Sequence, residues 1–519
     1  MRDEARSRWA GWRCRVTAAA AVAVIAGAVA DAAAQRRSDP LAGLDAYART
    51  TLTALRVPGI AIAVVRNDSV VFSRGFGVRA AGGAELVDDR TLFSLGSSGK
   101  AFTAAAAAVM VSDGAMRWDD PMVSLLPGFR LHDPYLTATV TVRDALSHRT
   151  GLPRGDLIWI GAGNISRAEI LKRVSYLEPT FGLRAHWGYS NIMYLAAGEA
   201  AGAVSGLGYD ELVRQRLLRP LGMTETIVNP STIDGLANLA SGHAPMGDSV
   251  YRKQFWFADR IAPAGAMTSN ARDMAQWLRF QLGDGSFGGQ RVMSREALAE
   301  MRRPQSIVLG DNEVDSLRRF STYGMGWFVE DYRGALIWHH GGATDGTTTM
   351  VAMLPEHRLG VVVLTNVAST VAPTALMRYV FDRHLGAPLK DWVAEASDRA
   401  ARARVMQDSS ARALERTRVG GKPPAPAERY AGAYRDAMYG DFTVRQQGDD
   451  LVATRGEWTG RLEYWNGNTF RWDLTGAMGT LQPYVFVRFD AEPNGTVSAA
   501  SFGLTPAERA SFRRVVERR

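Results

Sequence analysis

The sequence predicts an α+β domain followed by a separate, small all-β domain. Strand-like segments occur early, at residues 57–79, and late, at 323–367, whereas the segments between them have helical or loop character. One antiparallel sheet assembled from both ends of a domain and flanked by a helical lobe satisfies this order. After residue 427 the pattern changes to alternating segments that turn at Gly and Asn, which is typical of a β-barrel or sandwich.

These patterns divide the chain into four parts. The main domain is expected over residues 40–385, and a strongly charged helical linker over 386–427. The segment "VGGKPPAP" interrupts this helical pattern, as clusters of Gly and Pro do. The small β domain is expected over residues 428–519.

Residues 1–34 are interpreted as a signal peptide. Five arginines precede the apolar run "VTAAAAVAVIAGAVA", and Ala32 to Ala34 offer a small-residue cleavage site. The run is short for a membrane span, so we expect no integral membrane segment after cleavage. The protein is therefore predicted to be exported, periplasmic or secreted, with an uncleaved N-terminal anchor as the alternative.

Composition narrows the class of function. The chain is 46% hydrophobic and 22% charged, as in ordinary globular proteins. Its net charge is +8, but the basic residues form no continuous Lys/Arg block of the kind that favours nucleic-acid binding. The only cysteine, Cys14, lies within the predicted signal, so the mature chain has neither a catalytic thiol nor a disulfide. No cofactor is expected.

The stretch "SLGSSGKAFT" contains the first candidate catalytic residues. Only five of the 61 basic residues are lysines, and Lys100 stands three residues after Ser97 at the head of an alanine-rich run. If Ser97 opens a helix, the Lys100 amine lies one turn further on the same face and can reach the hydroxyl. The alternative for this S-x-x-K is a helix cap followed by an exposed lysine.

Two further motifs follow along the chain. In "WGYSNIMY", Tyr189 is placed to pass a proton and Asn191 to bind a substrate amide, or else the segment is a helix start with a packed aromatic. In "IWHHGGATDG", His340 and Gly342 share one face of a strand, and the N–H of Ala343 is a candidate oxyanion donor.

A metal site is not predicted. The side chains of His339 and His340 point to opposite faces of a strand, and no cluster of acidic residues or histidines lies near them in sequence.

Taken in order, Ser97-x-x-Lys100, Tyr189-x-Asn191 and His340-x-Gly342 resemble the three motifs of the β-lactamase-related serine hydrolases. This group holds class C β-lactamases, penicillin-binding peptidases, D-aminopeptidases and esterases. The resemblance covers about residues 40–385 and implies a β-lactamase/transpeptidase-like fold. The tail from residue 428, with "YAGAYRDAMYGDFTV", resembles the small lipocalin-like domain found at the C-terminus of some of these peptidases.

The resemblance implies acyl transfer through a serine ester. Ser97 would attack a carbonyl, Lys100 and Tyr189 would share the proton transfers, and the N–H groups of Ser97 and Ala343 would form the oxyanion hole. Asn191 and His340 would contact the substrate, although His339-His340-Gly341 also fits the third motif.

One departure from the family concerns recognition of a substrate carboxylate. Many penicillin-recognising members have lysine where His340 stands, and histidine is only partly charged near neutral pH. Arg184 is a candidate substitute for that cation. His148 and Asp345 are interpreted as structural residues, His148 binding backbone at a turn and Asp345 lying in one.

The sequence therefore predicts an exported serine hydrolase that acts on amide or ester bonds of a small molecule or short peptide, including peptides with D-amino acids. One alternative is a class C-like β-lactamase. The other is a penicillin-binding sensor module that is acylated without turnover.

Overall fold

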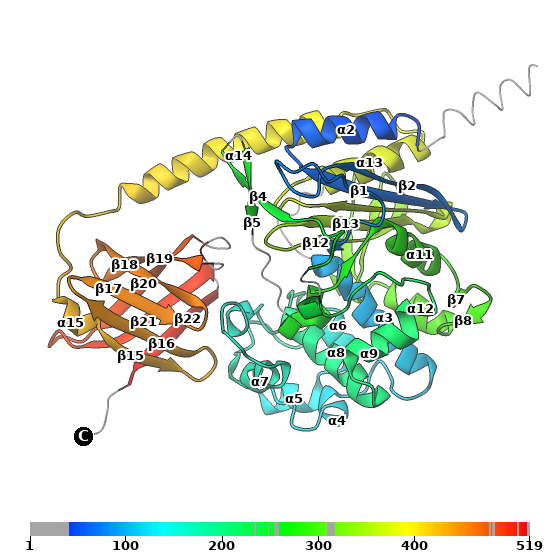
Figure 1. The fold of residues 1–519 in the computed structure, drawn as a ribbon. Helices are drawn as coiled ribbons and strands as arrows, with labels where there is room; N and C mark the ends of the chain where they lie inside the picture. Colours follow the sequence, from blue (N-terminus) through cyan, green and yellow to red (C-terminus); the bar gives the residue numbers. More distant parts are fainter. Residues whose placement is uncertain are drawn as a thin grey trace, which may run out of the picture.

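A computed structural model describes residues 41–232, 235–247, 249–253, 259–308, 317–476, 479, 483–505 and 508–515. The predicted signal peptide, residues 1–34, and Cys14 lie outside the described residues. Figure 1 shows a large α+β domain and a separate β-barrel joined by one long helix. The predicted fold class is confirmed.

The large domain is built on an eight-stranded antiparallel sheet whose strands come from both ends of the domain. In spatial order its strands are β2 (Ser69–Gly77), β1 (Gly59–Arg66), β14 (Leu359–Thr365), β13 (Thr348–Leu354), β12 (Ala335–Ala343), β11 (Phe328–Tyr332), β10 (Ser321–Tyr323) and β9 (Ser306–Ile307). The pairing of β1 with β14 closes the domain, since it joins segments about 300 residues apart.

Strand β1 is apolar from Gly59 to Val65 because both faces of the sheet are covered. Ile60, Ile62 and Val64 pack with the cluster that includes α2 (Leu44–Ala54) and α13 (Ala372–His384), whereas the alternate residues pack toward α11 (Ala271–Gln281) and the helical lobe. The hairpin to β2 turns at Asn67 and Asp68, both with positive φ, the combination that a type I′ hairpin turn requires. The turn divides the early strand-like region, residues 57–79, into two strands at "RNDS".

The helical lobe is organised around α3 (Lys100–Ser112) and α8 (Asn191–Ser205), which contact one another. Every residue of α3 from Lys100 to Met110 is buried, so its alanine run reflects close helix packing on all sides. The remaining helices of the lobe are α4 (Met122–Leu125), α5 (Pro134–Thr139), α6 (Val142–Leu146), α7 (Arg167–Arg173), α9 (Tyr209–Val213), α10 (Ala262–Gly265) and α12 (Arg295–Met301).

The C-terminal unit is a closed antiparallel barrel. It follows the long helix α14 (Trp392–Glu415) and the short α15 (Ala427–Tyr430). Its strands are β15 (Gly432–Asp436), β16 (Gly440–Gln447), β17 (Asp450–Arg455), β18 (Trp458–Asn466), β19 (Thr469–Leu474), β20 (Tyr484–Ala491), β21 (Val497–Thr505) and β22 (Glu508–Arg514). Buried aromatic side chains fill the interior, with Phe442 in ring contact with Tyr434, Trp472, Phe502 and Phe512.

The late strand-like region begins with the segment "YGMGWFVE", whose pattern predicts a single strand. This prediction is wrong, because β10 ends at Tyr323 and β11 begins at Phe328. The chain bends between them, where Gly326 has a φ of 82° and a Cβ there would lie 2.8 Å from the Cα of Ala101. The bend therefore packs against the start of α3.

In the described ranges, no helix is both long enough and apolar enough to cross a membrane.

Candidate active site

Ser97 lies in a tight 3-10 turn, Gly96–Gly99, between β3 (Phe93–Ser94) and α3. The expectation that it opens the helix is correct to within one turn, since α3 begins at Lys100. Gly96 has a φ of 54°, and a Cβ there would lie 2.6 Å from the backbone nitrogen of Ala343. Only glycine permits this contact, which brings the end of β12 beside the serine.

Lys100 is fully buried and reaches Ser97, which rules out the exposed-lysine interpretation. Its Nζ lies 3.0 Å from Ser97 Oγ and 2.7 Å from Asn191 Oδ1, and it also bonds the carbonyl of Ala264. Burial lowers the pKa of Lys100 well below its usual value, although the charge of Asp156 opposes this shift. The amine is thus favoured in the neutral form that can accept a proton.

Tyr189 completes the group around the serine. Its hydroxyl donates to Ser97 Oγ at 2.7 Å, and its ring lies 4.8 Å from the Lys100 Nζ. Burial raises the pKa of Tyr189 well above its usual value, so the phenol keeps its proton at neutral pH. The serine oxygen therefore has a candidate base and a candidate proton donor within hydrogen-bond reach at once.

Asn191 begins α8, with Ser190 as the N-cap, as the sequence predicts. Its two amide atoms are both engaged: Oδ1 accepts from Lys100, and Nδ2 donates to Asp156 Oδ1 at 3.0 Å. Asn191 also lines the cavity beside Ser97. It therefore links the lysine to a carboxylate in addition to facing the space expected for substrate.

Asp156 is a site residue that sequence reasoning missed. Its buried carboxylate accepts from Asn191 and from Trp159 Nε1 at 3.0 Å, and it pairs with Arg154 at 2.7 Å. Its segment, "LPRGDLIW", contains no motif of the kind that identifies Ser97 or Tyr189. The only signal in this segment is a pair of opposite charges two positions apart, Arg154 and Asp156, followed by Trp159.

The third motif lies on β12, but its side chains are not placed as expected. His340 is 2% exposed, and its Nε2 lies 3.0 Å from the hydroxyl of Tyr323. Burial lowers the pKa of His340 to about 3, so it carries no charge for a substrate carboxylate. His339 points to the other face and lies 2.9 Å from Glu330. Neither histidine lines the cavity at Ser97.

Gly342 is required for a steric reason. A Cβ there would lie 1.9 Å from the carbonyl oxygen of Leu95, so the glycine lets β12 pack against the turn that carries Ser97. Ala343, the next residue, is exposed and lines the cavity together with Ser97. The backbone N–H groups expected to form an oxyanion hole thus belong to two segments in direct contact.

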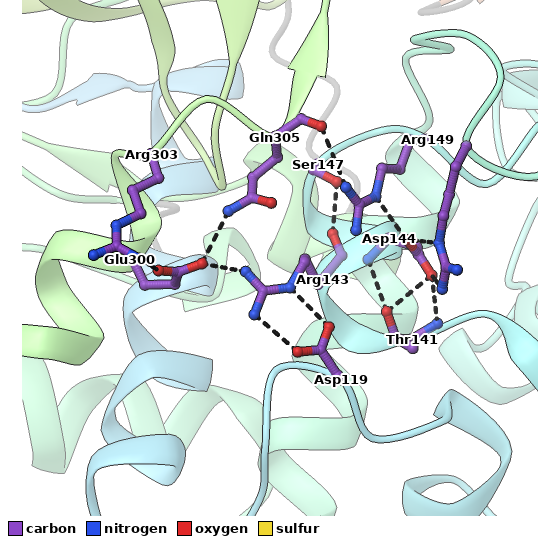
Figure 2. A network of polar contacts seen from close by, with 10 residues as sticks. Asp119, Thr141, Arg143, Asp144, Ser147, Arg149, Glu300, Arg303 and Gln305 are labelled. Atoms are coloured by element: carbon purple, nitrogen blue, oxygen red, sulfur yellow. Dashed lines mark hydrogen bonds and ion pairs between the residues drawn. The ribbon is translucent and has the colours of Figure 1, made fainter.

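Arg184 does not replace the missing cation. Its guanidinium pairs with the buried carboxylate of Asp144 at 2.8 Å, and it does not line the cavity. Asp144 also accepts from Arg149 and from Thr141, within the polar network of Figure 2. This network holds the segment that leads to His148.

His148 has the structural role that was predicted. Its Nδ1 accepts from the backbone N–H of Ser190 at 3.1 Å, and its carbonyl accepts from Gly188 at 2.7 Å. Its ring centroid lies 4.3 Å from that of Tyr189. His148 therefore fixes the entry to α8 and the position of the Tyr189 ring.

The cavity in front of Ser97 has a volume of about 270 Å³ and a mainly apolar lining. Trp159 and Ile160 form one side, Ile261 and residues 264–266 another, and residues 343–345 a third. Asp345 lies in the bend between β12 and β13, as expected, and none of the described residues lining the cavity is Lys, Arg or His. The cavity is suited to a neutral, apolar group.

The fold and this site define a member of the β-lactamase family. The family's sequence profile, described as Beta-lactamase, matches residues 44–382, and the chain belongs to this family. A second profile, described as a domain of unknown function (DUF3471), matches residues 416–514.

Curated relatives and solved structures agree with this assignment. The chain is 29% identical to the unguisins hydrolase ungD of Aspergillus violaceofuscus over 87% of this chain and 86% of the relative. It is 27% identical to penicillin-binding protein 4 of Amycolatopsis lactamdurans over 60% of this chain and 81% of the relative.

Among solved structures, the octameric penicillin-binding protein homologue of Pyrococcus abyssi superposes with a TM-score of 0.59. The two sequences are 20% identical, and the match covers 91% of this chain and 100% of the other. SurE superposes with a TM-score of 0.55 at 21% identity over 92% and 99% of the two chains. At these identities the two structures support the fold alone.

Proposed function

We propose that the protein is a serine hydrolase that cleaves amide or ester bonds through an acyl ester on Ser97. The observation that carries the proposal is the placement of one serine oxygen within 3.0 Å of the Lys100 amine and 2.7 Å of the Tyr189 hydroxyl, beside an apolar cavity. Membership of the β-lactamase family and the name of a relative, unguisins hydrolase, support it.

The reaction follows from the protonation states at the site. As Ser97 Oγ bonds to the substrate carbonyl carbon, its proton passes to the neutral Lys100 amine. The Tyr189 hydroxyl gives its proton to the leaving amine or alcohol, and Lys100 replaces it, so that the bond breaks and an ester of Ser97 remains. Water then attacks the ester carbon and gives a proton to the same two groups. They pass a proton to Ser97 Oγ as its bond to the acyl carbon breaks and the acid is released.

The substrate is proposed to be a neutral, apolar acyl or peptidyl group. The lining described above offers apolar surface and no cationic side chain, and buried His340 is uncharged at neutral pH. The apolar lining and the resemblance to a group that includes D-aminopeptidases make peptides with apolar D-residues the first amides to test.

The test is an intact-mass time course with p-nitrophenyl butyrate and with benzylpenicillin, using Ser97→Ala as the control. We expect an acyl adduct and turnover with the ester, both lost in Ser97→Ala, and little reaction with the penicillin. Absence of any Ser97-dependent adduct with esters or D-residue peptides would refute the hydrolase proposal.

A β-lactamase is the second candidate, favoured by the similarity to penicillin-binding protein 4. Rapid Ser97-dependent hydrolysis of benzylpenicillin would establish it, whereas a lasting adduct without turnover would identify a sensor-type module.

We also propose that the protein is exported, with residues 1–34 as a cleaved signal. This rests on the arginines, the apolar run and the alanines at 32–34. Determination of the N-terminus of the mature protein after expression in a bacterial host tests it. An N-terminus near residue 35 is expected, and retention of Met1 with the apolar run contradicts cleavage.

A further inference from the structure

The barrel reaches the catalytic domain through the hairpin of β17 and β18, close to the cavity at Ser97. The end of this hairpin, residues 455–458, meets the loop formed by residues 157–163. That loop carries Trp159 and Ile160, which line the cavity. One wall of the candidate active site is therefore held from outside the catalytic domain.

Arg455 makes the central contact of this junction. It is 2% exposed, and its guanidinium donates to the carbonyls of Leu157 at 2.6 Å and Ile160 at 3.0 Å, and to that of Tyr439 in the barrel at 3.3 Å. A buried cation is costly unless its hydrogen-bonding groups are satisfied. Here two of its three acceptors belong to the loop, so the loop conformation and the burial of Arg455 depend on each other.

The backbones of the two segments are also in close contact. The N–H of Glu457 donates to the carbonyl of Gly161 at 3.0 Å, and its carboxylate pairs with Arg260 at 3.0 Å. Gly161 has a φ of 63°, and a Cβ there would lie 1.5 Å from Trp458 Nε1. The loop therefore has no room to shift toward the barrel, and hydrogen bonds that its carbonyls accept from the barrel keep it from moving away.

On the inner side, the same loop is hydrogen-bonded to the residues around Ser97. Trp159 Nε1 donates to Asp156, which in turn accepts from Asn191 beside Lys100. The wall formed by Trp159 and Ile160 is thus fixed between the barrel and the group around Ser97. Loosening the outer attachment is expected to widen the cavity before it disturbs Ser97.

We propose that the barrel hairpin is a specificity determinant of the hydrolase, in which Arg455 is a positioning residue that fixes Trp159 and Ile160 and limits the cavity to short or compact apolar acyl groups. This inference rests on the proposed function of Ser97. It gives the barrel a part in forming the substrate site, and this role is indicated neither by the sequence motifs nor by the names of the similar proteins.

The experiment compares Arg455→Met with Arg461→Met in the full-length protein. Arg461 lies on β18 but is exposed and pairs with Asp450, so its replacement is a matched control. The activity measured is kcat/KM for p-nitrophenyl esters from acetate to decanoate. Arg455→Met is expected to raise the ratio of long-chain to short-chain activity about tenfold, while Arg461→Met leaves it unchanged.

Hydrogen exchange provides a second measurement that does not depend on activity. In Arg455→Met the amides of residues 157–163 are expected to exchange faster, with those of β20 to β22 still protected. If the wild type cleaves no ester, the proposed function fails while exchange still tests the junction. An unchanged chain-length ratio, an equal loss for all esters, or unchanged exchange would overturn the inference.

A milder variant covers the case in which Arg455→Met does not fold. Glu457→Gln keeps the backbone bond to Gly161 and removes only the charge that pairs with Arg260. It is expected to shift the same ratio in the same direction by a smaller factor. A shift toward shorter esters would contradict the proposal.

Discussion

Asp156 provides the sharpest test of how the candidate catalytic group, Ser97, Lys100, Tyr189 and Asn191, is held together, because its two oxygens have different partners. Oδ1 accepts from Asn191 Nδ2 and Trp159 Nε1, whereas Oδ2 pairs with Arg154, whose side chain is 52% exposed. Asp156→Asn can keep the first pair of bonds with its amide oxygen and loses only the ion pair. Asp156→Ala loses all of them.

The magnitudes follow from these partners. An ion pair to a half-exposed arginine contributes about 0–1 kcal/mol, so Asp156→Asn is expected to lower the free energy of unfolding by no more than that. Asp156→Ala leaves two half-buried donors, Asn191 Nδ2 and Trp159 Nε1, without this acceptor, at no more than about 1–3 kcal/mol each. Because Asn191 also loses its anchor beside Lys100, kcat/KM is expected to fall about 100-fold, equivalent to about 2.7 kcal/mol.

The pH dependence has a definite sign. The charge of Asp156 raises the pKa of Lys100, in opposition to burial. Its removal in Asp156→Asn therefore lowers that pKa further, and the acid limb of kcat/KM for ester hydrolysis moves to lower pH.

The assays are urea unfolding and pH–rate profiles, with Asp45→Asn as the control because Asp45 forms an exposed pair with Arg74. A shift of the acid limb to higher pH, or equal losses in the Asn and Ala variants, would refute the reasoning.

Three further predictions concern the residues around Ser97. Lys100→Arg keeps a permanent charge, cannot accept the serine proton, and is expected to lower kcat/KM for esters about 10³-fold in a folded protein judged by circular dichroism; retained activity would exclude Lys100 as the base. Because His340 is buried with a pKa of about 3, His340→Gln is expected to leave the shape of the pH–rate profile for ester hydrolysis unchanged between about pH 5 and 8. Loss of a titration step in that range would contradict this. A Cβ at Gly342 would lie 1.9 Å from a carbonyl oxygen, whereas at Gly341 the nearest atoms lie 3.7 Å away. Gly342→Ala is therefore expected to cost about 1–3 kcal/mol in urea unfolding and Gly341→Ala little, and equal costs would argue against the close approach of β12.

The sequence by itself determined the class of fold and the residues of the candidate catalytic group. Alternation and helical period are local properties of the chain, so the early and late strands of the sheet and the change to a β domain were visible without coordinates. Ser97 and Lys100 are linked by one helical turn, a spacing that the sequence states directly. Tyr189 and Asn191 likewise stand at a recognisable helix start, and all four residues meet in the structure.

Only the tertiary structure decided what surrounds that group. Asp156 and Arg455 belong to no motif, and their roles arise from contacts between segments about 35 and 300 residues apart along the chain. The strand pattern correctly separated the faces of His339 and His340, but it could not show that the second face is covered by Tyr323. Periodicity shows which residues share a face of a helix or strand. Which element packs on that face depends on long-range contacts. These contacts also determine how deeply His340 and Lys100 are buried, and burial lowers the pKa of both side chains.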